Sequence, residues 1–292
     1  MHEIILAQNE ATITLEKFLA RKFPIGYVRK IFRKNGARIN GRRAKENDLV
    51  RAGDRIQLYV PFEAARKMPK PSAAPTPIAT IFEDDALLVI DKPAGLAVHE
   101  GKTVSKRLSI LGVLESRYRE AGIKPRLVHR LDKDTSGLLL VAKNERTAQA
   151  LIEAFASGEV HKEYACLVAG RLPSNEGKID LPLPGREGRL VRALTRFRVV
   201  KRFAETSFAR VVIDTGRLHQ IRLHFAKLGY PVVLDDQHGD FGFNKRFQKQ
   251  YGLKRQFLHA EKLRTEYAGK AREWAAPLPA DLQEVLRRLE QR

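Results

Sequence analysis

The chain has 292 residues, of which 43% are hydrophobic, and this length suffices for one large domain or two ordinary ones with a sizeable core. Its formal net charge of +20 predicts a polyanionic partner, of which nucleic acid is the commonest kind. A single cysteine excludes an internal disulfide bond and a cysteine-based zinc site, and the chain lacks the run of about 18 apolar residues that a membrane-spanning helix needs.

The first ten residues lack the basic region and the longer apolar core of a signal peptide, so we expect a cytoplasmic protein with no membrane partner. No glycine-rich phosphate-binding loop occurs, and His219 and His224 lack the spacing of a zinc-binding helix. We therefore expect neither a metal site nor a small-molecule cofactor.

Residues 1–62 are predicted to form a small basic module that contains two helices. Thr14 is a suitable N-cap for the first helix, and Leu15, Phe18 and Leu19 follow on one helical face. This apolar face predicts that the helix packs onto the core of the module.

The second helix of the module and the hairpin after it carry the candidate RNA-binding residues. Asn35-Gly36 ends the helix, and Asn40-Gly41 has the residues of a tight hairpin turn. The candidates are the cations of these two elements: Arg29, Lys30, Arg33, Lys34, Arg38, Arg42 and Arg43. A charged helix face is usually only solvated, but residues 1–60 hold 13 Lys and Arg against 6 Asp and Glu. Two basic elements in so small a unit favour phosphate binding.

The module resembles the S4 domain, a small RNA-binding domain of some ribosomal proteins and RNA-modifying enzymes, over residues 12–60. The resemblance rests on the two helices, the hairpin with Ile39-Asn40-Gly41, and Gly53-Asp54. A linker is predicted at residues 63–78, where four prolines stand among small and basic residues and favour an extended chain.

The remaining residues, 79–292, alternate short strands with a few helices. Strands are predicted at residues 80–82, 87–91, 138–142, 160–168, 196–202 and 207–214. Helices are predicted at residues 144–158, at residues 217–229, and after Asp281, a candidate N-cap. Consecutive strands without regular crossover helices predict an α+β domain with a largely antiparallel mixed sheet.

Residues 129–138 are the strongest candidate for a catalytic segment. They place Asp132 between basic residues and ahead of a tight turn predicted at Ser136-Gly137. Nearby positive charge favours an ionised carboxylate, which suits a nucleophile better than an acid. The alternative is a structural salt bridge beside a turn, and the residues alone leave both interpretations open. Asp134, which lies in the same segment, is interpreted as structural.

Two further side chains are candidates for the site. Arg222 lies just beyond the apolar stripe of the helix predicted at 217–229, so it needs a carboxylate partner if it is buried. Asp132 would be that partner if the two segments meet, and the alternative is an arginine whose head reaches water. Tyr164 lies on the apolar side of its strand, which fits either core packing or stacking on a nucleic-acid base.

Four motifs resemble, in order and spacing over residues 80–275, those of the RluA family of pseudouridine synthases. They lie at residues 91–95, 129–137, 162–164 and 216–224. Leu218 departs from the family pattern, which usually has Thr, Ser or Pro before the histidine. Residues 234–240 and 257–260 are most similar to the RluC type of that family, whose substrates are uridines of large-subunit ribosomal RNA.

The resemblance implies a role for each matching residue. Asp132 would be the catalytic nucleophile, Arg222 would hold it, and Tyr164 would stack on the target uracil and assist the proton step at C5. Arg130 would enter the base stack that the flipped uridine leaves, and His129 and Ile221 would complete the substrate-binding set. RNA, of the ribosomal kind that the RluC type modifies, would be the partner of a monomeric enzyme.

Isomerising uridine to pseudouridine needs no water, hydride or electron. This agrees with a sequence that has no recognisable metal-site or nucleotide-binding motif. The enzyme must extrude the base from its stack, which costs a few kcal/mol. Three alternatives stay open at this point. They are a non-enzymatic S4-type RNA-binding or ribosome-assembly protein, a nucleic-acid N-glycosylase, and a pseudouridine synthase that acts on transfer RNA.

Overall fold

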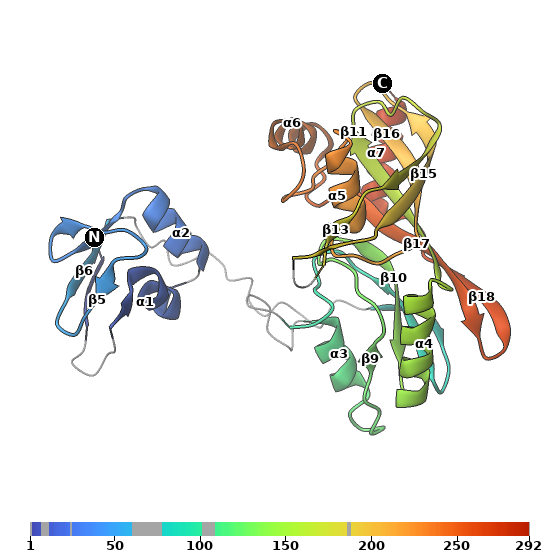
Figure 1. Cartoon of the computed structure of the whole chain (residues 1–292), viewed down its shortest axis with the longest axis horizontal. Helices are drawn as coiled ribbons and strands as arrows, with labels where there is room; N and C mark the ends of the chain where they lie inside the picture. Colours follow the sequence, from blue (N-terminus) through green and yellow to red (C-terminus); the bar gives the residue numbers. More distant parts are fainter. Residues whose placement is uncertain are drawn as a thin grey trace. The chain divides into compact units, whose positions relative to one another are not determined.

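The computed structural model describes residues 2–6, 12–23, 25–59, 78–100, 109–185 and 188–291, with the backbone alone for His2, Ile25, Gly26, Arg29 and Lys30. The chain forms two compact units, Met1–Ala74 and Pro75–Arg292 (Figure 1). The division between them lies within the predicted linker, of which residues 63–77 are outside the described residues. None of the described helices is long and apolar enough to span a membrane.

The first unit packs two helices onto a small antiparallel sheet with the strand order β1-β6-β3-β4. Its elements are β1 (His2–Ile5), β2 (Ile13–Thr14), α1 (Leu15–Lys22), α2 (Ile25–Arg33), β3 (Ala37–Ile39), β4 (Arg42–Arg43), β5 (Leu49–Val50) and β6 (Arg55–Leu58). The Thr14 side chain caps α1 by accepting from the Lys17 N–H at 3.5 Å. Asn40 (φ 49°) and Gly41 (φ 80°) both adopt the left-handed conformation that a two-residue hairpin turn requires.

The core of the first unit explains why α1 and α2 form where the pattern predicts them. Leu15, Phe18 and Leu19 of α1 meet Val28 and Ile31 of α2, and all five side chains are fully or almost fully buried. The sheet completes this core, and Arg33 of α2 and the hairpin cations Arg38, Arg42 and Arg43 are exposed.

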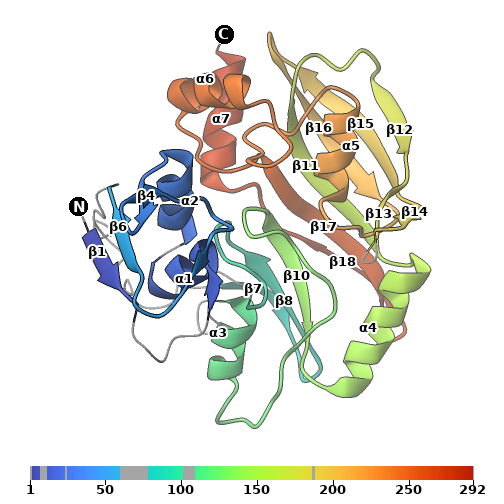
Figure 2. The same ribbon diagram turned by 60° about the vertical axis from the view of Figure 1, so that its left-hand side comes forward.

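The second unit is built on one ten-stranded mixed sheet with the order β12-β15-β16-β11-β17-β10-β8-β7, while β18 pairs with β17 and β9 with β10 (Figure 2). Its elements are β7 (Ala79–Glu83), β8 (Leu87–Lys92), α3 (Ile110–Arg117), β9 (Arg126–Leu127), β10 (Ser136–Ala142), α4 (Glu145–Ser157), β11 (His161–Ala169), β12 (Glu176–Asp180), β13 (Leu183–Pro184), β14 (Leu190–Val191), β15 (Leu194–Arg202), β16 (Thr206–Ile213), α5 (Gln220–Lys227), α6 (Phe241–Tyr251), β17 (Leu258–Tyr267), β18 (Lys270–Ala275) and α7 (Ala280–Glu290). Within the described ranges, β10 and β17 form the one parallel pair of neighbouring strands.

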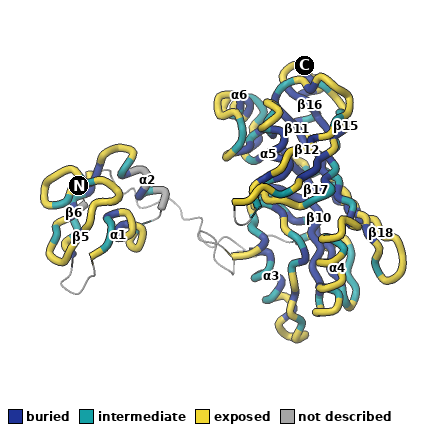
Figure 3. Tube along the Cα trace, in the orientation of Figure 1, coloured by how far each residue is buried: buried dark blue, intermediate teal, exposed yellow. Residues whose placement is uncertain are grey.

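Alternating side chains divide the sheet into two covered faces. Tyr164, Cys166 and Val168 of β11 join the cluster that also contains α3 and α5, whereas Ala165 and Leu167 join the cluster of α6 and α7. The same alternation holds in β10, whose even-numbered residues pack with α4. Figure 3 shows the central strands as the buried part of this unit. The face that carries α5 is the one that positions the site.

Two sequence predictions about element ends are wrong. The helix predicted from Arg217 begins at Gln220, because His219 adopts a left-handed conformation (φ 52°) that interrupts the helix, and Leu218 before it is 53% exposed. The last helix has Pro279 rather than Asp281 as its N-cap residue, because the Asp281 carboxylate is engaged by Arg255 in a bidentate pair at 2.7 and 2.9 Å.

The turn beside Asp132 also lies earlier than predicted. It is centred on Lys133 and Asp134 and closed by the Thr135 N–H donating to the Asp132 carbonyl at 3.1 Å. Ser136 and Gly137 already belong to β10, where Gly137 (φ 112°) opposes Ala260 of β17. Asp132 is therefore held between a turn and the start of a central strand.

Candidate functional site

A cavity of about 460 Å³ lies where the segment with Asp132, strand β11 and the N-terminal end of α5 meet. Five of its lining residues are Asp132, Tyr164, Arg222, Arg130 and His219. The structure thus brings together the three predicted catalytic residues, which are as much as 90 positions apart in the sequence. The lining is mixed, with aromatic and aliphatic walls and a few polar groups, as is usual for a ligand site.

Asp132 presents its carboxylate at the surface of this cavity. Its Oδ2 accepts a hydrogen bond from Arg222 Nη1 at 3.0 Å, and its side chain is 18% exposed. His219 Nε2 lies 3.8 Å from the other oxygen, Oδ1. One oxygen is therefore engaged by a guanidinium, and the other remains open toward the cavity.

Arg222 is buried and is held mainly by a carboxylate that the sequence reasoning did not assign. Its Nε and Nη2 donate to Asp235 at 2.7 and 2.8 Å, while Nη2 reaches the exposed Asp236 at 3.4 Å. Burial alone would lower the pKa of Arg222, but the hydrogen bonds and charges of Asp235 and Asp132 outweigh it and raise the pKa. The guanidinium is thus a permanent cation that joins Asp132 to the buried Asp235.

Asp235 is fully buried and also accepts the backbone N–H groups of Gln237 and His238, both at 2.9 Å. Burial raises the pKa of Asp235, but these hydrogen bonds and Arg222 outweigh it and lower the pKa below its ordinary value. Leu234, immediately before it, has φ 60°, a conformation that is rare for a bulky side chain. The backbone is therefore strained where it turns to face Arg222.

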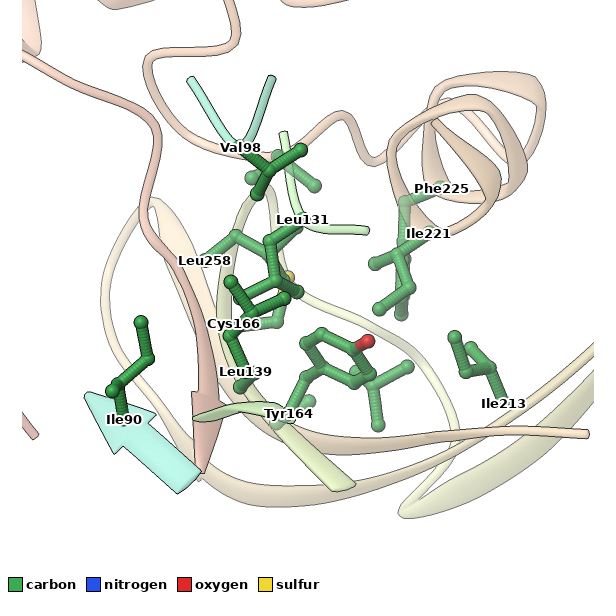
Figure 4. Packing of buried hydrophobic residues seen from close by; sticks show 14 of the residues in the cluster. Ile90, Val98, Leu131, Leu139, Tyr164, Cys166, Ile213, Ile221, Phe225 and Leu258 are labelled. Carbon is green, nitrogen blue, oxygen red and sulfur yellow. The ribbon is translucent and has the colours of Figure 1, made fainter. Parts of the chain in front are cut away.

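Tyr164 forms one wall of the cavity and is 7% exposed. Figure 4 shows its ring packed among aliphatic side chains, with the hydroxyl turned toward the side of Ile213 and Ile221. Burial, and then the charge of Asp132, raises the pKa of Tyr164, so its phenol stays protonated. Tyr164 offers a flat aromatic surface rather than a ready base.

The predicted substrate-binding residues differ in how far they can reach a ligand. Arg130 is exposed at the cavity, whereas Ile221 is 4% exposed and lines its wall. His129 is tied to the scaffold, because its Nε2 accepts the Leu140 N–H at 2.9 Å and its ring stacks on Phe155 at 4.5 Å. Burial lowers the pKa of His129 to about 3, so the ring is neutral.

Sequence comparisons with known proteins identify the family. Residues 86–227 match the family model of RNA pseudouridylate synthase. A ribosomal large subunit pseudouridine synthase C of Vibrio cholerae is 34% identical over 93% of this chain and 90% of its own length. The protein of that name from Escherichia coli K12 is 33% identical over 98% of this chain and 96% of its own length.

The chain belongs to the RNA pseudouridylate synthase family. It is therefore an isomerase, an RNA pseudouridine synthase that moves C1′ of a uridine from N1 to C5 of the same base. The fold agrees with this: the structure of human RNA pseudouridylate synthase domain containing 4 superposes with a TM-score of 0.62, at 24% identity, over 73% of this chain and 93% of the human one.

In this pseudouridine synthase a buried lysine, Lys92, hydrogen-bonds the backbone of the segment that contains Asp132. Lys92 is fully buried, and its Nζ donates to the carbonyls of Pro93, Leu96 and Lys133 at 2.7, 2.9 and 3.1 Å. Burial lowers the pKa of Lys92 to about 7, while the three carbonyls match the three donors of its ammonium form. The Gly95 N–H also donates to the Lys133 carbonyl at 2.9 Å.

The predicted RNA-binding cations of the first unit lie on its surface where they are described. Arg33, Lys34, Arg38, Arg42 and Arg43 are all exposed, and the Arg38 guanidinium lies 4.8 Å from the centre of the Tyr59 ring. Arg29 and Lys30 lie in α2, and their side chains are outside the described part of the structure.

Three polar residues of the site were not assigned by sequence reasoning: Lys92, His219 and Asp235. A signal existed for Asp235, because an arginine beside a buried helix face needs a carboxylate, and Leu234-Asp235 follows that helix closely. No signal in the sequence alone could place His219 beside Asp132, because that contact depends on how two distant segments meet. Across the described ranges, no group of three or more His, Cys, Asp and Glu side chains is arranged to hold a metal ion.

Proposed function

We propose that this pseudouridine synthase modifies specific uridines of large-subunit ribosomal RNA, with Asp132 as its nucleophile. The observation that supports the role of Asp132 is its position: one oxygen is held by Arg222 at 3.0 Å and the other is open to a cavity with a buried aromatic wall. The choice of RNA is supported by the names of the relatives, which align over almost their whole length.

The proposed reaction begins when the target uridine leaves its stack and enters the cavity. Extruding the uridine costs a few kcal/mol of stacking free energy. Arg130 is exposed at the cavity and would fill the place that the uridine leaves in the RNA stack. Tyr164 would stack on the uracil ring, which suits its buried, uncharged phenol. Ile221 would complete the apolar wall, and His129 would act indirectly by holding the segment against β10.

Asp132 would then engage C1′ while the C1′–N1 bond breaks, either as a covalent nucleophile or by stabilising the sugar intermediate. Arg222 would keep one carboxylate oxygen fixed, so that the other points at the sugar. The freed uracil rotates within the cavity and C5 bonds to C1′. No atom is gained or lost in this exchange, apart from a proton that leaves C5 and a proton that N1 acquires.

We also infer that the first unit is an S4-type RNA-binding module. Support comes from two packed helices, a hairpin that begins at Ala37, and exposed cations on both elements. These cations would contact phosphates rather than bases, and so would add affinity without sequence preference. An RNA substrate of this kind agrees with the cytoplasmic location that the sequence predicts.

The proposed function is tested with RNA that carries tritium at C5 of its uridines. Wild-type enzyme should release tritium from large-subunit ribosomal RNA while the base stays attached to the chain. Asp132→Asn should lower the release rate by about 10³-fold or more, because the variant lacks the charged nucleophile. Asp134→Asn is the matched control, since this carboxylate lies in the same turn but outside the cavity, and it should keep most of the activity.

Several results would contradict the proposal. Release from transfer RNA alone would show that the substrate is wrong, and an active Asp132→Asn would show that the nucleophile is wrong. Free uracil among the products would indicate glycosidic cleavage instead of isomerisation.

A further inference from the structure

His219 stands beside Asp132 in the cavity, contacts His238, and has no role in the proposed reaction so far. His219 lines the cavity with its side chain 20% exposed, and its Nε2 lies 3.8 Å from Asp132 Oδ1. Its backbone is left-handed (φ 52°, ψ 26°), a conformation that costs free energy for a residue with a side chain. The chain thus tolerates strain where this imidazole faces the carboxylate.

His238 holds the ring of His219 from the other side. His219 Nδ1 lies 3.1 Å from His238 Nε2, and the two rings meet edge to face at 5.3 Å. The backbone of His238 is fixed in turn, because its main-chain N–H donates to the buried Asp235 at 2.9 Å. When Nδ1 of His219 carries the proton and donates to His238, Nε2 of His219 keeps a lone pair that faces the cavity.

The isomerisation requires a proton acceptor in this place. Once C5 has bonded to C1′, the proton to be removed sits on an atom next to C1′, and C1′ is the atom that Asp132 engages. Asp132 itself, once C1′ has left it, or a group beside Asp132 is therefore placed to accept the proton, and the His219 variant below distinguishes the two. Arg222 has no lone pair to offer, and the Tyr164 phenol holds its own proton because burial and Asp132 raise its pKa.

We propose that His219 is the general base of the reaction: its Nε2 takes the proton from C5 after the C1′–C5 bond forms. His219 then passes this proton to N1: the electrons of the C5–H bond restore the C5=C6 bond, the N1=C6 pair moves to N1, and the hydrogen of the new N1–H exchanges with water, so that tritium from C5 is released. The C5–H bond breaks, an N1–H bond forms, and the enzyme ends in its starting protonation state. This proposal depends on the role proposed for Asp132 and adds the step that follows it.

The charges around His219 suit an acceptor that works near neutral pH. Burial lowers the pKa of His219 below its ordinary value of 6.5, and Arg222 and His238 lower it further, whereas Asp132 and Asp235 raise it. The ring is therefore neutral before the reaction. The nearby Asp132 then favours the imidazolium that forms when Nε2 takes the proton.

The test compares wild-type enzyme with His219→Gln on one target RNA that carries hydrogen, deuterium or tritium at C5. The variant should release tritium about 10²-fold more slowly, the usual contribution of a general base, with unchanged RNA affinity. Its primary deuterium isotope effect should grow, because the proton step then limits the rate. His161→Gln, which removes a histidine at the start of β11, is the control and should match the wild type.

His238→Ala gives a second readout that a merely structural role would not move. Because His238 lowers the pKa of His219, its removal should shift the acid limb of the pH–rate profile toward higher pH. In His219→Gln that limb should disappear.

The outcomes separate this inference from the proposed function. Wild-type enzyme that releases no tritium from any RNA would refute the proposed function. Equal rates for wild type and His219→Gln, or a slow variant with an unchanged isotope effect, would refute the role of His219 alone. Loss of RNA affinity in His219→Gln would also refute it, since the residue would then be a binding contact.

Discussion

At the scale of single residues, Asp235 is the group on which the geometry of Arg222 depends. Asp235 is fully buried and accepts hydrogen bonds from two of the three guanidinium nitrogens of Arg222, Nε and Nη2. Asp132 accepts only from the third nitrogen, Nη1, so the direction in which Arg222 faces Asp132 depends on the Arg222–Asp235 pair.

We expect Asp235→Asn to impair both stability and catalysis. Removing one partner of a buried ion pair leaves the other charge unpaired, which costs about 3 to 5 kcal/mol of the free energy of unfolding. The rate constant for isomerisation should fall while RNA affinity changes little, because Arg222 would no longer aim at Asp132. Urea unfolding and single-turnover assays measure the two effects.

Asp236→Asn is the matched control for Asp235→Asn. Asp236 also approaches Arg222, at 3.4 Å, but its side chain is 73% exposed, so its removal should change the free energy of unfolding by less than about 1 kcal/mol. Equal losses in the two variants would contradict the role given to burial.

The contact between Asp132 and Arg222 was a hypothesis from the sequence that geometry alone could test. The sequence showed that an arginine at the edge of a buried helix face needs a carboxylate partner, but it did not show which segment supplies that carboxylate. The structure supplies three: Asp132, Asp235 and the exposed Asp236. Asp235 was missed because it follows the helix in a loop, where no periodic pattern places a side chain.

At the scale of elements, the parallel contact between β10 and β17 fixes the start of the strand that follows Asp132. Gly137 (φ 112°) opposes Ala260 so closely that a Cβ atom would lie 2.2 Å from the Ala260 carbonyl oxygen. Only a residue without a side chain permits this pairing.

We expect Gly137→Ala to destabilise the second unit by about 3 kcal/mol or more, because backbone rather than a flexible side chain must move. Gly122→Ala is the control: Gly122 also has a positive φ (67°), but nothing lies within 4 Å of its would-be Cβ. It should cost about 1 to 2 kcal/mol, the usual penalty for the left-handed conformation. Similar losses of thermal stability in both variants would show that the close contact is not decisive.

The elements with a clear period were predictable, and those without one were not. β11, β15 and β16 alternate and lie within a few residues of their predicted bounds, and Asn144 caps α4 as expected. β17 was not predicted, although it joins β10 to β11, because its polar residues obscure the alternation. α6 was missed as well, although Asp240 caps it and Gly252 ends it.

At the scale of the whole molecule, the excess of positive charge predicts that RNA binding depends strongly on salt. Each phosphate contact contributes about 0.7 to 0.9 to the slope of log affinity against log salt concentration. The exposed cations of the β3–β4 hairpin are candidates for part of that slope.

We expect the combined substitutions Arg38→Gln, Arg42→Gln and Arg43→Gln in the full chain to lower the magnitude of this slope by about 2. A titration of RNA binding at several salt concentrations measures it. The control replaces Lys270 and Arg272 with Gln, two exposed cations of the hairpin formed by β17 and β18. A slope unchanged by the triple substitution would show that the first unit makes no phosphate contacts.

The division into two units was predictable because four prolines stand in the segment of the sequence where the chain divides. The order in which the strands of the large sheet pair was not predictable. Strands distant in sequence become neighbours only in an arrangement that covers both faces of the sheet at once.

The carbonyl contacts of Lys92 have a thermodynamic consequence for the enzyme. They tie the Lys133 carbonyl, in the turn after Asp132, to the segment that carries Pro93 and Leu96, through groups that do not line the cavity. The conformational entropy of this segment is thus lost during folding and not when RNA binds. The free energy of RNA association then remains available for pulling a uridine out of its stack, the one step that the protein must drive uphill.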